Sequence, residues 1–416
     1  MKLHKNELAA CLCIAAGVGL VLSTAFWSPA ALVGSFVGGT AESAAGAEAS
    51  ALAAPAPTAA PTPSPTPEPT PVVETVRFSA TGDDLIHEGI YNQARARGTD
   101  GGYDFSAAYA NLKDFYAGFD INWLNQETLV NDAFAPSGYP CFSTPTDIGK
   151  ALYDVGFRVF SLSNNHSYDQ GAEGIRSSMA FWDTMPDDVV TAGFYNLTSY
   201  DNLSYQTVNG ITFGYLSYTQ LTNGIPTPDG TEYGVVLLDD TDTVAQQMAT
   251  ARANCDVLVI SCHWGIEGSH TVSDYQKEKA QWLADHGADL IIGTHPHVTQ
   301  DAAWLTASDG RPVFVAYSLG NFINAQSEPD NMIGAILDLS VQKTTLPDGT
   351  ATIALQNPVL HPVITQYENG YDNIRVYLYR DYTDELGAAH GNFTLSRDSI
   401  AKVFSGSIQS QFISFD

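Results

Sequence analysis

Histidine, carboxylate and amide side chains recur at one kind of place in this sequence, directly after short apolar runs. The residues so placed are Asp83, Asp84, His87, Glu127, Asn165, His166, Asp169, His263, Glu267, His295 and His297. Histidine nitrogens combined with carboxylate and amide oxygens are ligands that suit Zn²⁺, Mn²⁺ or Fe. The sequence therefore predicts a site for a divalent metal, with one or two ions.

The pair His295 and His297 is the most informative single motif. Pro296 lies between them, and a proline disfavours helix for the residue before it, so both rings can converge on one point. A lone histidine after a strand more often caps or packs, and the Asn165–His166 pair alone could be a turn. The metal site is therefore predicted from the five loops together and not from any one of them.

Alternating strand-like and helical patterns would place these loops. Strands are expected at 76–82, 120–127, 157–166, 211–220, 256–265 and 288–297. Helices are expected at 106–119, 144–156, 171–185, 240–255 and 273–287, the last with Ser273 as its N-cap and Gly287 as its stop. Further strands at 311–322, 332–342, 352–365 and 373–382 follow without helices between them. This order predicts an α/β fold with a largely parallel sheet and an antiparallel addition.

The carboxyl ends of parallel strands collect functional groups, because the loops that follow the strands converge there. The five polar loops should therefore meet at one edge of the sheet. The last two strands, from Thr352 onward, could be a small appended lobe or the far edge of the same sheet. The pattern alone leaves both arrangements open.

The N-terminal part of the chain is typical of an exported, tethered protein. Lys2 and Lys5 lie in a short cytoplasmic segment (1–7) before a largely apolar run (8–27), which is long enough to span a bilayer. A cleaved signal peptide is the competing interpretation. An Ala/Pro/Thr-rich linker (28–74) follows, with the composition of a disordered spacer. We expect a single-pass cell-membrane protein with an extracytoplasmic domain.

The charge balance excludes one class of partner. The chain has 18 Lys and Arg against 46 Asp and Glu, a formal net charge of −28. Nucleic acids are bound through basic patches, so a nucleic-acid partner is not expected. An anionic polymer would also be repelled by the overall field unless metal ions or a local basic patch offset it.

Six segments in order, TGDDLIH, NQE, SLSNNHSYDQG, CHWGIE, GTHPHVTQ and YSLGNF, resemble the signature of the CapA family. This family of bacterial capsule and poly-γ-glutamate synthesis proteins, PgsA-like, is itself similar to calcineurin-like metallophosphatases. The resemblance covers about residues 76–325. It implies a metallophosphatase-like, layered sheet-and-helix domain over 75–345. Residues 346–416 would complete that domain or be appended to it.

The resemblance also implies roles for individual residues. The metal ligands would be Asp83, His87, Glu127, Asn165, His263, His295 and His297. The catalytic residues would be His166, which would donate a proton, Asp169, which could orient it, and Glu267. Ser318 and Asn321 would line the pocket with Glu267.

Two positions depart from the metallophosphatase pattern. Asp83 and His87 are four residues apart where that pattern has two, and Glu127 replaces a bridging aspartate. Both departures weaken the expectation of two closely spaced ions.

Three functions follow as alternatives. The first is a cell-surface metal-dependent hydrolase or transferase acting on phosphoesters, or on amide bonds of an anionic polymer or peptide. The second is a non-catalytic accessory or anchoring subunit that works with a membrane polymer synthase. The third is metal-free acid–base chemistry of the epimerase type.

Overall fold

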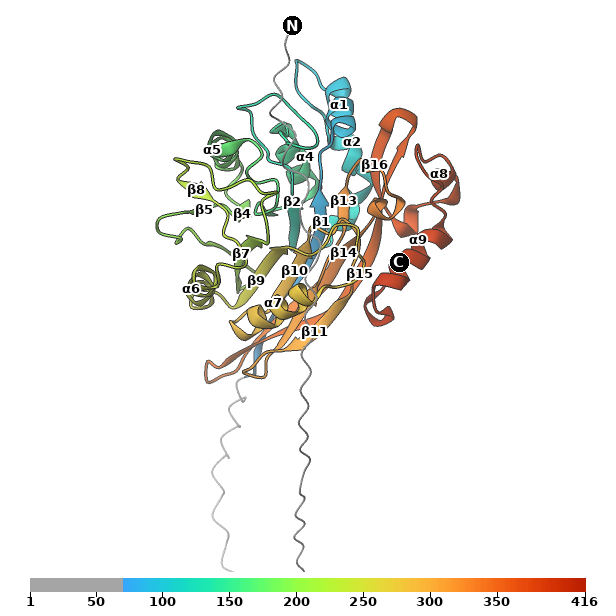
Figure 1. Ribbon diagram of the computed structural model, residues 1–416. Helices are drawn as coiled ribbons and strands as arrows, with labels where there is room; N and C mark the ends of the chain where they lie inside the picture. The colour runs from blue at the N-terminus through green and yellow to red at the C-terminus, as the bar shows by residue number, and fades with distance from the viewer. Residues whose placement is uncertain (1–69) are drawn as a thin grey trace, which may run out of the picture. The chain divides into compact units, whose positions relative to one another are not determined.

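Two β-sheets packed against each other form the centre of the protein (Figure 1). The computed structural model describes residues 70–416, which belong to one unit. No helix among these residues is long and apolar enough to cross a membrane. The predicted anchor (8–27) and most of the predicted linker (28–74) lie outside the described residues.

The first sheet has the order β16-β15-β14-β1-β2-β3-β4, with β13 paired to the end of β1. Its parallel half contains β1 (Val72–Asp84), β2 (Ile121–Gln126), β3 (Val159–Ser161), β4 (Val190–Ala192) and β13 (Asn321–Ile323). Its antiparallel half contains β14 (Ile333–Thr345), β15 (Ala351–Glu368) and β16 (Asp372–Leu378). The strands after Thr352 are therefore the far edge of this sheet and not a separate lobe.

The second sheet has the order β11-β12-β10-β9-β7-β6. Its four central strands are parallel, and each edge strand is antiparallel to its neighbour. The strands are β6 (Ser204–Val208), β7 (Ile211–Thr219), β9 (Val257–His263), β10 (Leu290–Thr294), β11 (Ala302–Thr306) and β12 (Pro312–Ala316). A two-stranded ribbon of β5 (Tyr195–Asn196) and β8 (Tyr233–Gly234) lies outside both sheets.

Direct contacts join the inner faces of the two sheets. Phe78 of β1 stacks on Phe213 of β7, with 6.2 Å between the ring centroids. The Ser161 hydroxyl of β3 lies 2.7 Å from that of Ser217 and 2.9 Å from that of Ser261. β9 and β10 are buried along their whole length, because they are covered on both faces. Strands in this position have continuous apolar runs in their sequence and no alternation of apolar and polar residues.

Helices cover the outer face of each sheet. On the first sheet lie α1 (Glu88–Arg97), α2 (Ser106–Tyr109), η1 (Ala110–Leu112), α3 (Lys113–Tyr116), α4 (Asp147–Val155) and α5 (Gly171–Trp182). On the second sheet lie α6 (Thr241–Arg252) and α7 (Asp274–Asp285). The C-terminal part adds α8 (Asp384–Ala388) and α9 (Arg397–Ser407), with short 3₁₀ turns at Pro329–Met332, Asn369–Tyr371 (η3), Tyr379–Asp381 and Ser410–Phe412. Figure 1 shows α8 and α9 on the opposite side from α5 and α6.

Most sequence-predicted elements are present, and the differences have local causes. α7 begins with a capping box of Ser273 and Gln276, as the Ser273 N-cap predicted, and ends before Gly287 at φ 108°. The single helix expected at 106–119 is instead three short pieces, because tertiary packing overrides the local pattern. Tyr109 is buried there and its hydroxyl donates to Asp84. β1 begins at Val72, three residues before the domain boundary expected at 75.

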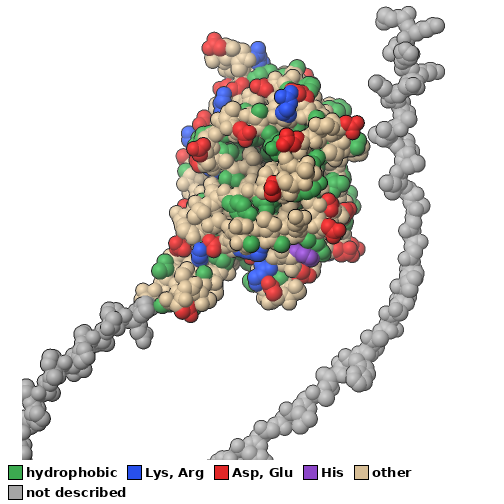
Figure 2. Space-filling view, turned by 90° about the vertical axis from the view of Figure 1, so that its left-hand side faces the viewer, with side chains coloured by type: hydrophobic (Ala, Val, Ile, Leu, Met, Phe, Trp, Pro, Cys, Tyr) green, Lys and Arg blue, Asp and Glu red, His purple; other side chains and the backbone are tan. Residues whose placement is uncertain are grey.

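The acidic surface is dispersed. Figure 2 shows the face on the left of Figure 1, where Asp and Glu side chains are scattered among apolar and neutral ones and not gathered into one patch. The net charge of the chain therefore does not mark a single binding surface on this face.

Candidate metal centre

The carboxyl ends of parallel strands from both sheets meet at one place. Asp83 lies at the end of β1, Glu127 directly follows β2, and His263 is the last residue of β9. Asn165 lies in the loop after β3, and His295 directly follows β10. The fold thus brings together loops that are separated by more than two hundred residues in the sequence.

Asn165, His263 and His295 form the tightest part of this cluster. His263 Nε2 lies 2.9 Å from Asn165 Oδ1 and 3.1 Å from His295 Nδ1. His263 Nδ1 lies 3.0 Å from the Thr294 hydroxyl, which can accept its proton. With that tautomer, His263 Nε2 and Asn165 Oδ1 both present lone pairs to each other, so no hydrogen bond joins them. Converging lone pairs of this kind are what a cation requires.

Glu127 lies at the centre of the cluster. Its side chain is fully buried, and Oε1 is 3.6 Å from His263 Nε2 and 3.8 Å from His297 Nε2. Neither carboxylate oxygen has a hydrogen-bond partner among the described residues. A buried carboxylate without partners is costly, since it loses the hydrogen bonds that water would give it. A bound cation would remove that cost.

Asp83 and His297 form the other side of the cluster. Asp83 Oδ2 lies 3.4 Å from His297 Nδ1 and accepts from the His295 backbone N–H at 3.2 Å. The second Asp83 oxygen accepts from Asn125 Nδ2 at 2.7 Å. His297 Nδ1 also lies 3.0 Å from Asn321 Oδ1. Asp83, Glu127 and His263 offer donor atoms that all lie within 4.8 Å of one another.

The loop that carries the two histidines has an unusual backbone. His295 has φ 93° and His297 has φ 59°, both in the region that side chains other than glycine rarely adopt. Strain of this kind persists where surrounding contacts impose it, and such residues cluster at functional sites. With these conformations the ring centroids of His295 and His297 lie 6.0 Å apart.

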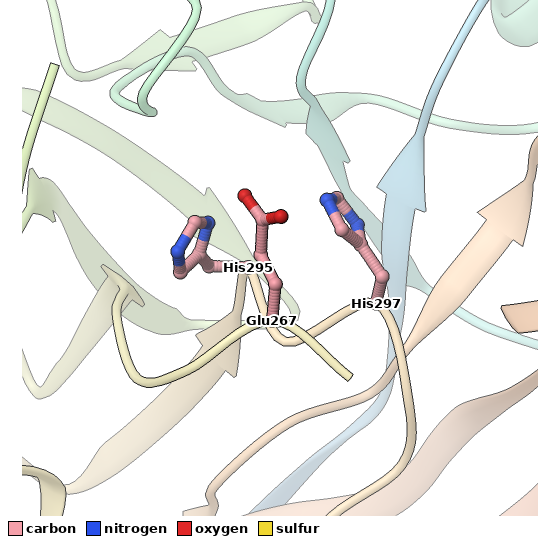
Figure 3. Close-up of side chains that lie close together, drawn as sticks. All are labelled: Glu267, His295 and His297. Atoms are coloured by element: carbon pink, nitrogen blue, oxygen red, sulfur yellow. The ribbon is translucent and has the colours of Figure 1, made fainter. Parts of the chain in front are cut away.

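Glu267 closes the cluster on its solvent side. It lies in the loop after β9 and is exposed. Figure 3 shows its carboxylate between the rings of His295 and His297, and the donor atoms of the three residues lie within 4.8 Å of one another. Glu267 can therefore act as an additional ligand or as a group that faces the substrate.

His166 and Asp169 form a pair beside the metal-type cluster. His166 Nδ1 lies 2.8 Å from Asp169 Oδ2, and both side chains are buried. The Asn223 amide nitrogen is 3.5 Å from the same ring nitrogen, and Asn223 Oδ1 accepts from Asn165 Nδ2 at 3.2 Å. Asp169 thus orients the His166 ring and leaves Nε2 for contact with a substrate.

His87 and Asp84 lie outside the ligand cluster. Burial lowers the pKa of His87, and His297 and His166 are close enough for their charges to lower it further. His87 Nδ1 lies 3.2 Å from the Leu85 carbonyl oxygen and 3.3 Å from the Ala325 backbone nitrogen. Among residues 70–416, His87 belongs to neither group whose donor atoms lie within 4.8 Å of one another. Asp84 accepts from the Tyr109 hydroxyl at 2.6 Å, and burial raises its pKa to about 7. Of the two neighbouring aspartates, Asp83 is the one in the cluster.

Burial and crowding shift the pKa values in the cluster strongly. Burial, and then the nearby Asp83 and Glu267 carboxylates, raise the pKa of Glu127 well above its usual range. Burial and the neighbouring histidines lower the pKa of His263 well below its usual range and that of His295 to about 3. Burial opposes protonation of His297, but its contacts with Asp83 raise its pKa overall. The histidines 263 and 295 are therefore neutral at physiological pH, which is the protonation state of a metal ligand.

The donor set fits a divalent transition metal. Of the seven predicted ligands, the structure brings six together: Asp83, Glu127, Asn165, His263, His295 and His297. Reasoning from the sequence missed the supporting residues Asn125, Thr294 and Asn223. Asn125 is two residues before Glu127 on the same strand end, so the strand alternation could have identified it; the other two carry no signal that separates them from ordinary polar residues.

Comparisons with known proteins show the family of this chain. Residues 77–326 match the family described as "Bacterial capsule synthesis protein PGA_cap". "PGA biosynthesis protein CapA" of Bacillus subtilis is 27% identical over 266 residues, 64% of this chain and 67% of that protein. "Capsule biosynthesis protein CapA" of Bacillus anthracis is 29% identical over 60% of both chains. The matched part of the chain thus spans 67% of the length of the first relative and 60% of the second.

A solved structure of the NAD nucleotidase of Haemophilus influenzae is also similar. It is 16% identical, with a TM-score of 0.41 over 82% of this chain and 57% of that one.

Proposed function

The chain belongs to the bacterial capsule synthesis protein PGA_cap family, and from that membership we propose that it takes part in the synthesis or export of a capsule polymer of the poly-γ-glutamate type. The names of the two Bacillus relatives support this process. The family match covers the second sheet, the parallel strands of the first sheet from residue 77 onward, and all the loops of the candidate metal centre.

We further propose that the candidate metal centre makes the protein a metal-dependent hydrolase or transferase. One observation carries this proposal: among the described residues neither oxygen of the buried Glu127 carboxylate has a hydrogen-bond partner, although Asp83, His263 and His297 surround it. The residues that would hold one or two Zn²⁺, Mn²⁺ or Fe ions are Asp83, Glu127, Asn165, His263, His295 and His297. Such an ion supplies positive charge and an activated water nucleophile.

The other residues of the site have separate tasks. His166, oriented by Asp169 at 2.8 Å, would donate a proton to the leaving group as general acid. Glu267 faces the rings of His295 and His297 from the solvent side and would contact the substrate or the ion. Asn125 holds Asp83, and Thr294 holds His263, so both ligands keep a fixed orientation.

The location and partners are part of the same proposal. The apolar segment 8–27, the lysines before it and the Pro-rich segment after it support a single-pass anchor with an extracytoplasmic domain. The substrate would be an anionic polymer or a peptide, and the protein would work beside the membrane subunits of a polymer synthase.

The metal content of the purified full-length chain tests the proposal. We expect stoichiometric transition metal in the native protein and its loss in a His263→Ala/His295→Ala variant. A His270→Ala/His286→Ala variant, which removes two histidines outside the cluster, is the matched control and should retain the metal.

A folded, metal-free protein that takes up no added Zn²⁺ or Mn²⁺ would contradict the metal-dependent mechanism. The accessory-subunit function would then be the better explanation. Activity that survives chelation would instead favour acid–base chemistry without a metal.

A further inference from the structure

A cleft of about 620 Å³ opens at His87, the residue that precedes α1. Its walls are one side of α1 from Glu88 to Ala96, the loop at Gly138 and Tyr139, and the turn at Tyr371 and Asp372 that joins β15 to β16. Figure 1 shows this turn next to α1. Gly89 is what allows the approach, because a Cβ there would lie 2.9 Å from Tyr371 Cβ.

The cleft has a distinct chemical character. Two carboxylates, Glu88 and Asp372, line it, and no lysine or arginine does. Glu88 Oε1 accepts only from the Asn92 amide, at 3.4 Å, and within the described part of the chain neither carboxylate forms a salt bridge. Two tyrosines, of which Tyr139 is 78% exposed, add aromatic rings. Carboxylates and aromatic faces without a counter-cation are the groups that recognise an ammonium ion.

His87 connects this cleft to the candidate metal centre. It lines the cleft, and the contacts that it makes with Leu85 and Ala325 use Nδ1 only. On the other side, its ring meets the buried Phe142 edge-on, with centroids 5.2 Å apart, and Phe142 meets His166 in the same way at 4.7 Å. A single buried ring therefore separates a residue of the cleft from the proposed general acid.

We propose that this cleft binds an alkylammonium group carried on a peptide chain, and that it thereby places an amine-bearing residue next to the metal centre. Glu88 and Asp372 would neutralise the ammonium, the two tyrosines would contact its methylenes, and His87 Nε2 would meet the polar backbone. An extended polyanion does not fit, since it would face two carboxylates and no cation. The inference rests on the proposed function only in taking the metal centre as the place of reaction.

Binding of three blocked tripeptides to the full-length protein tests this proposal without any turnover. The probes are acetyl-trilysine amide, acetyl-trialanine amide and acetyl-triglutamate amide, measured by calorimetry at 0.15 M salt. We expect trilysine to bind best. A Glu88→Gln/Asp372→Asn variant should weaken trilysine binding by about tenfold, because each exposed ion pair contributes modestly.

A matched control separates the cleft from general attraction to an acidic protein. Asp183→Asn/Glu232→Gln removes the same charge from two other clefts and should leave the affinity for trilysine within about twofold. Equal losses in both variants, or triglutamate binding as tightly as trilysine, would overturn the proposal.

Failure of the proposed function would have a different signature. The His263→Ala/His295→Ala variant should bind trilysine as the native protein does while it loses metal. Trilysine binding that depends on the cleft carboxylates in a protein without metal would sustain the inference and contradict the metal-dependent mechanism alone.

Discussion

Replacing Glu127 with glutamine should have opposite effects on the metal-free and the metal-loaded protein. Burial and two neighbouring carboxylates raise the pKa of Glu127, so the folded metal-free state favours the protonated form. The folded state then binds more protons than the unfolded one, and stability falls as pH rises above the unfolded-state pKa. Glutamine cannot ionise, and its amide can donate hydrogen bonds to the surrounding lone pairs.

The magnitudes follow from the size of the domain and from mass action. Unfolding about 350 residues with ~2.1 cal/mol/K each gives an entropy near 0.7 kcal/mol/K, so each kcal/mol moves Tm by roughly 1.4 °C. Replacing a carboxyl group that must take up a proton on folding should raise the stability of the metal-free protein by about 1–2 kcal/mol at pH 8. Metal at about 100 times its Kd should raise the free energy of unfolding of the native protein by about 2.7 kcal/mol, which corresponds to a rise in Tm of roughly 4 °C.

Thermal unfolding with and without Mn²⁺ or Zn²⁺ measures both effects. We expect Glu127→Gln to melt about 2 °C higher than the native protein after chelation, and to gain much less than 4 °C from added metal. Glu278→Gln, on the exposed face of α7, is the matched control and should behave as the native protein does. An equal metal-induced rise in Tm in the native protein and in Glu127→Gln would refute the assignment of this carboxylate as a metal ligand.

Three further results are expected. Asp169→Asn should lower turnover at least tenfold and leave metal content unchanged, because it only orients His166; a parallel loss of metal would show that the pair is structural. Burial lowers the pKa of His87 from 6.5 to about 4, so the neutral ring contributes roughly 3 kcal/mol to the free energy of unfolding above pH 6.5. This contribution is lost as the pH falls toward 4, and His87→Gln should flatten that part of the pH–stability curve in urea titrations. Gly293→Ala should destabilise by about 1–3 kcal/mol or prevent folding, as judged by circular dichroism, since its Cβ would lie 1.9 Å from the Tyr317 carbonyl oxygen.

The order of strands and helices could be predicted because local signals marked it. Ser273 and Gly287 delimit α7, and buried apolar runs mark β9 and β10. The division of the strands into two sheets carries no local signal, because a strand buried on both faces has the same pattern against a helix or against another sheet. The metallophosphatase-like fold stays a prediction from the resemblance.

The candidate site was predictable where residues follow strands and less so where they support one another. Position after a strand identified Asp83, Glu127, His263 and His295, since the ends of parallel strands converge. Position could not separate a ligand from a neighbour. His87 satisfies the same rule, yet its ring nitrogen meets the backbone of Leu85 and Ala325.

The pairing of β1 with β2 can explain why a glutamate, Glu127, replaces the bridging aspartate of the metallophosphatase pattern. β1 and β2 are parallel, and Asp83 lies opposite Asn125, whose amide holds one of its oxygens at 2.7 Å. The place beside Asp83 on the strand is thus taken by an amide, and the next residue on that face is Glu127, beyond the strand end. A carboxylate there needs the extra methylene of glutamate to reach between His263 and His297, where Oε1 lies 3.6 and 3.8 Å from their ring nitrogens.

The longer spacing from Asp83 to His87 has a corresponding effect. His87 is the residue that precedes α1, and its ring lies between the cleft and Phe142. The Asp83 side of the centre therefore has fewer nearby donors than the side formed by Glu127, Asn165, His263 and His295. The histidine that the metallophosphatase pattern would use as a ligand lines the cleft in this chain.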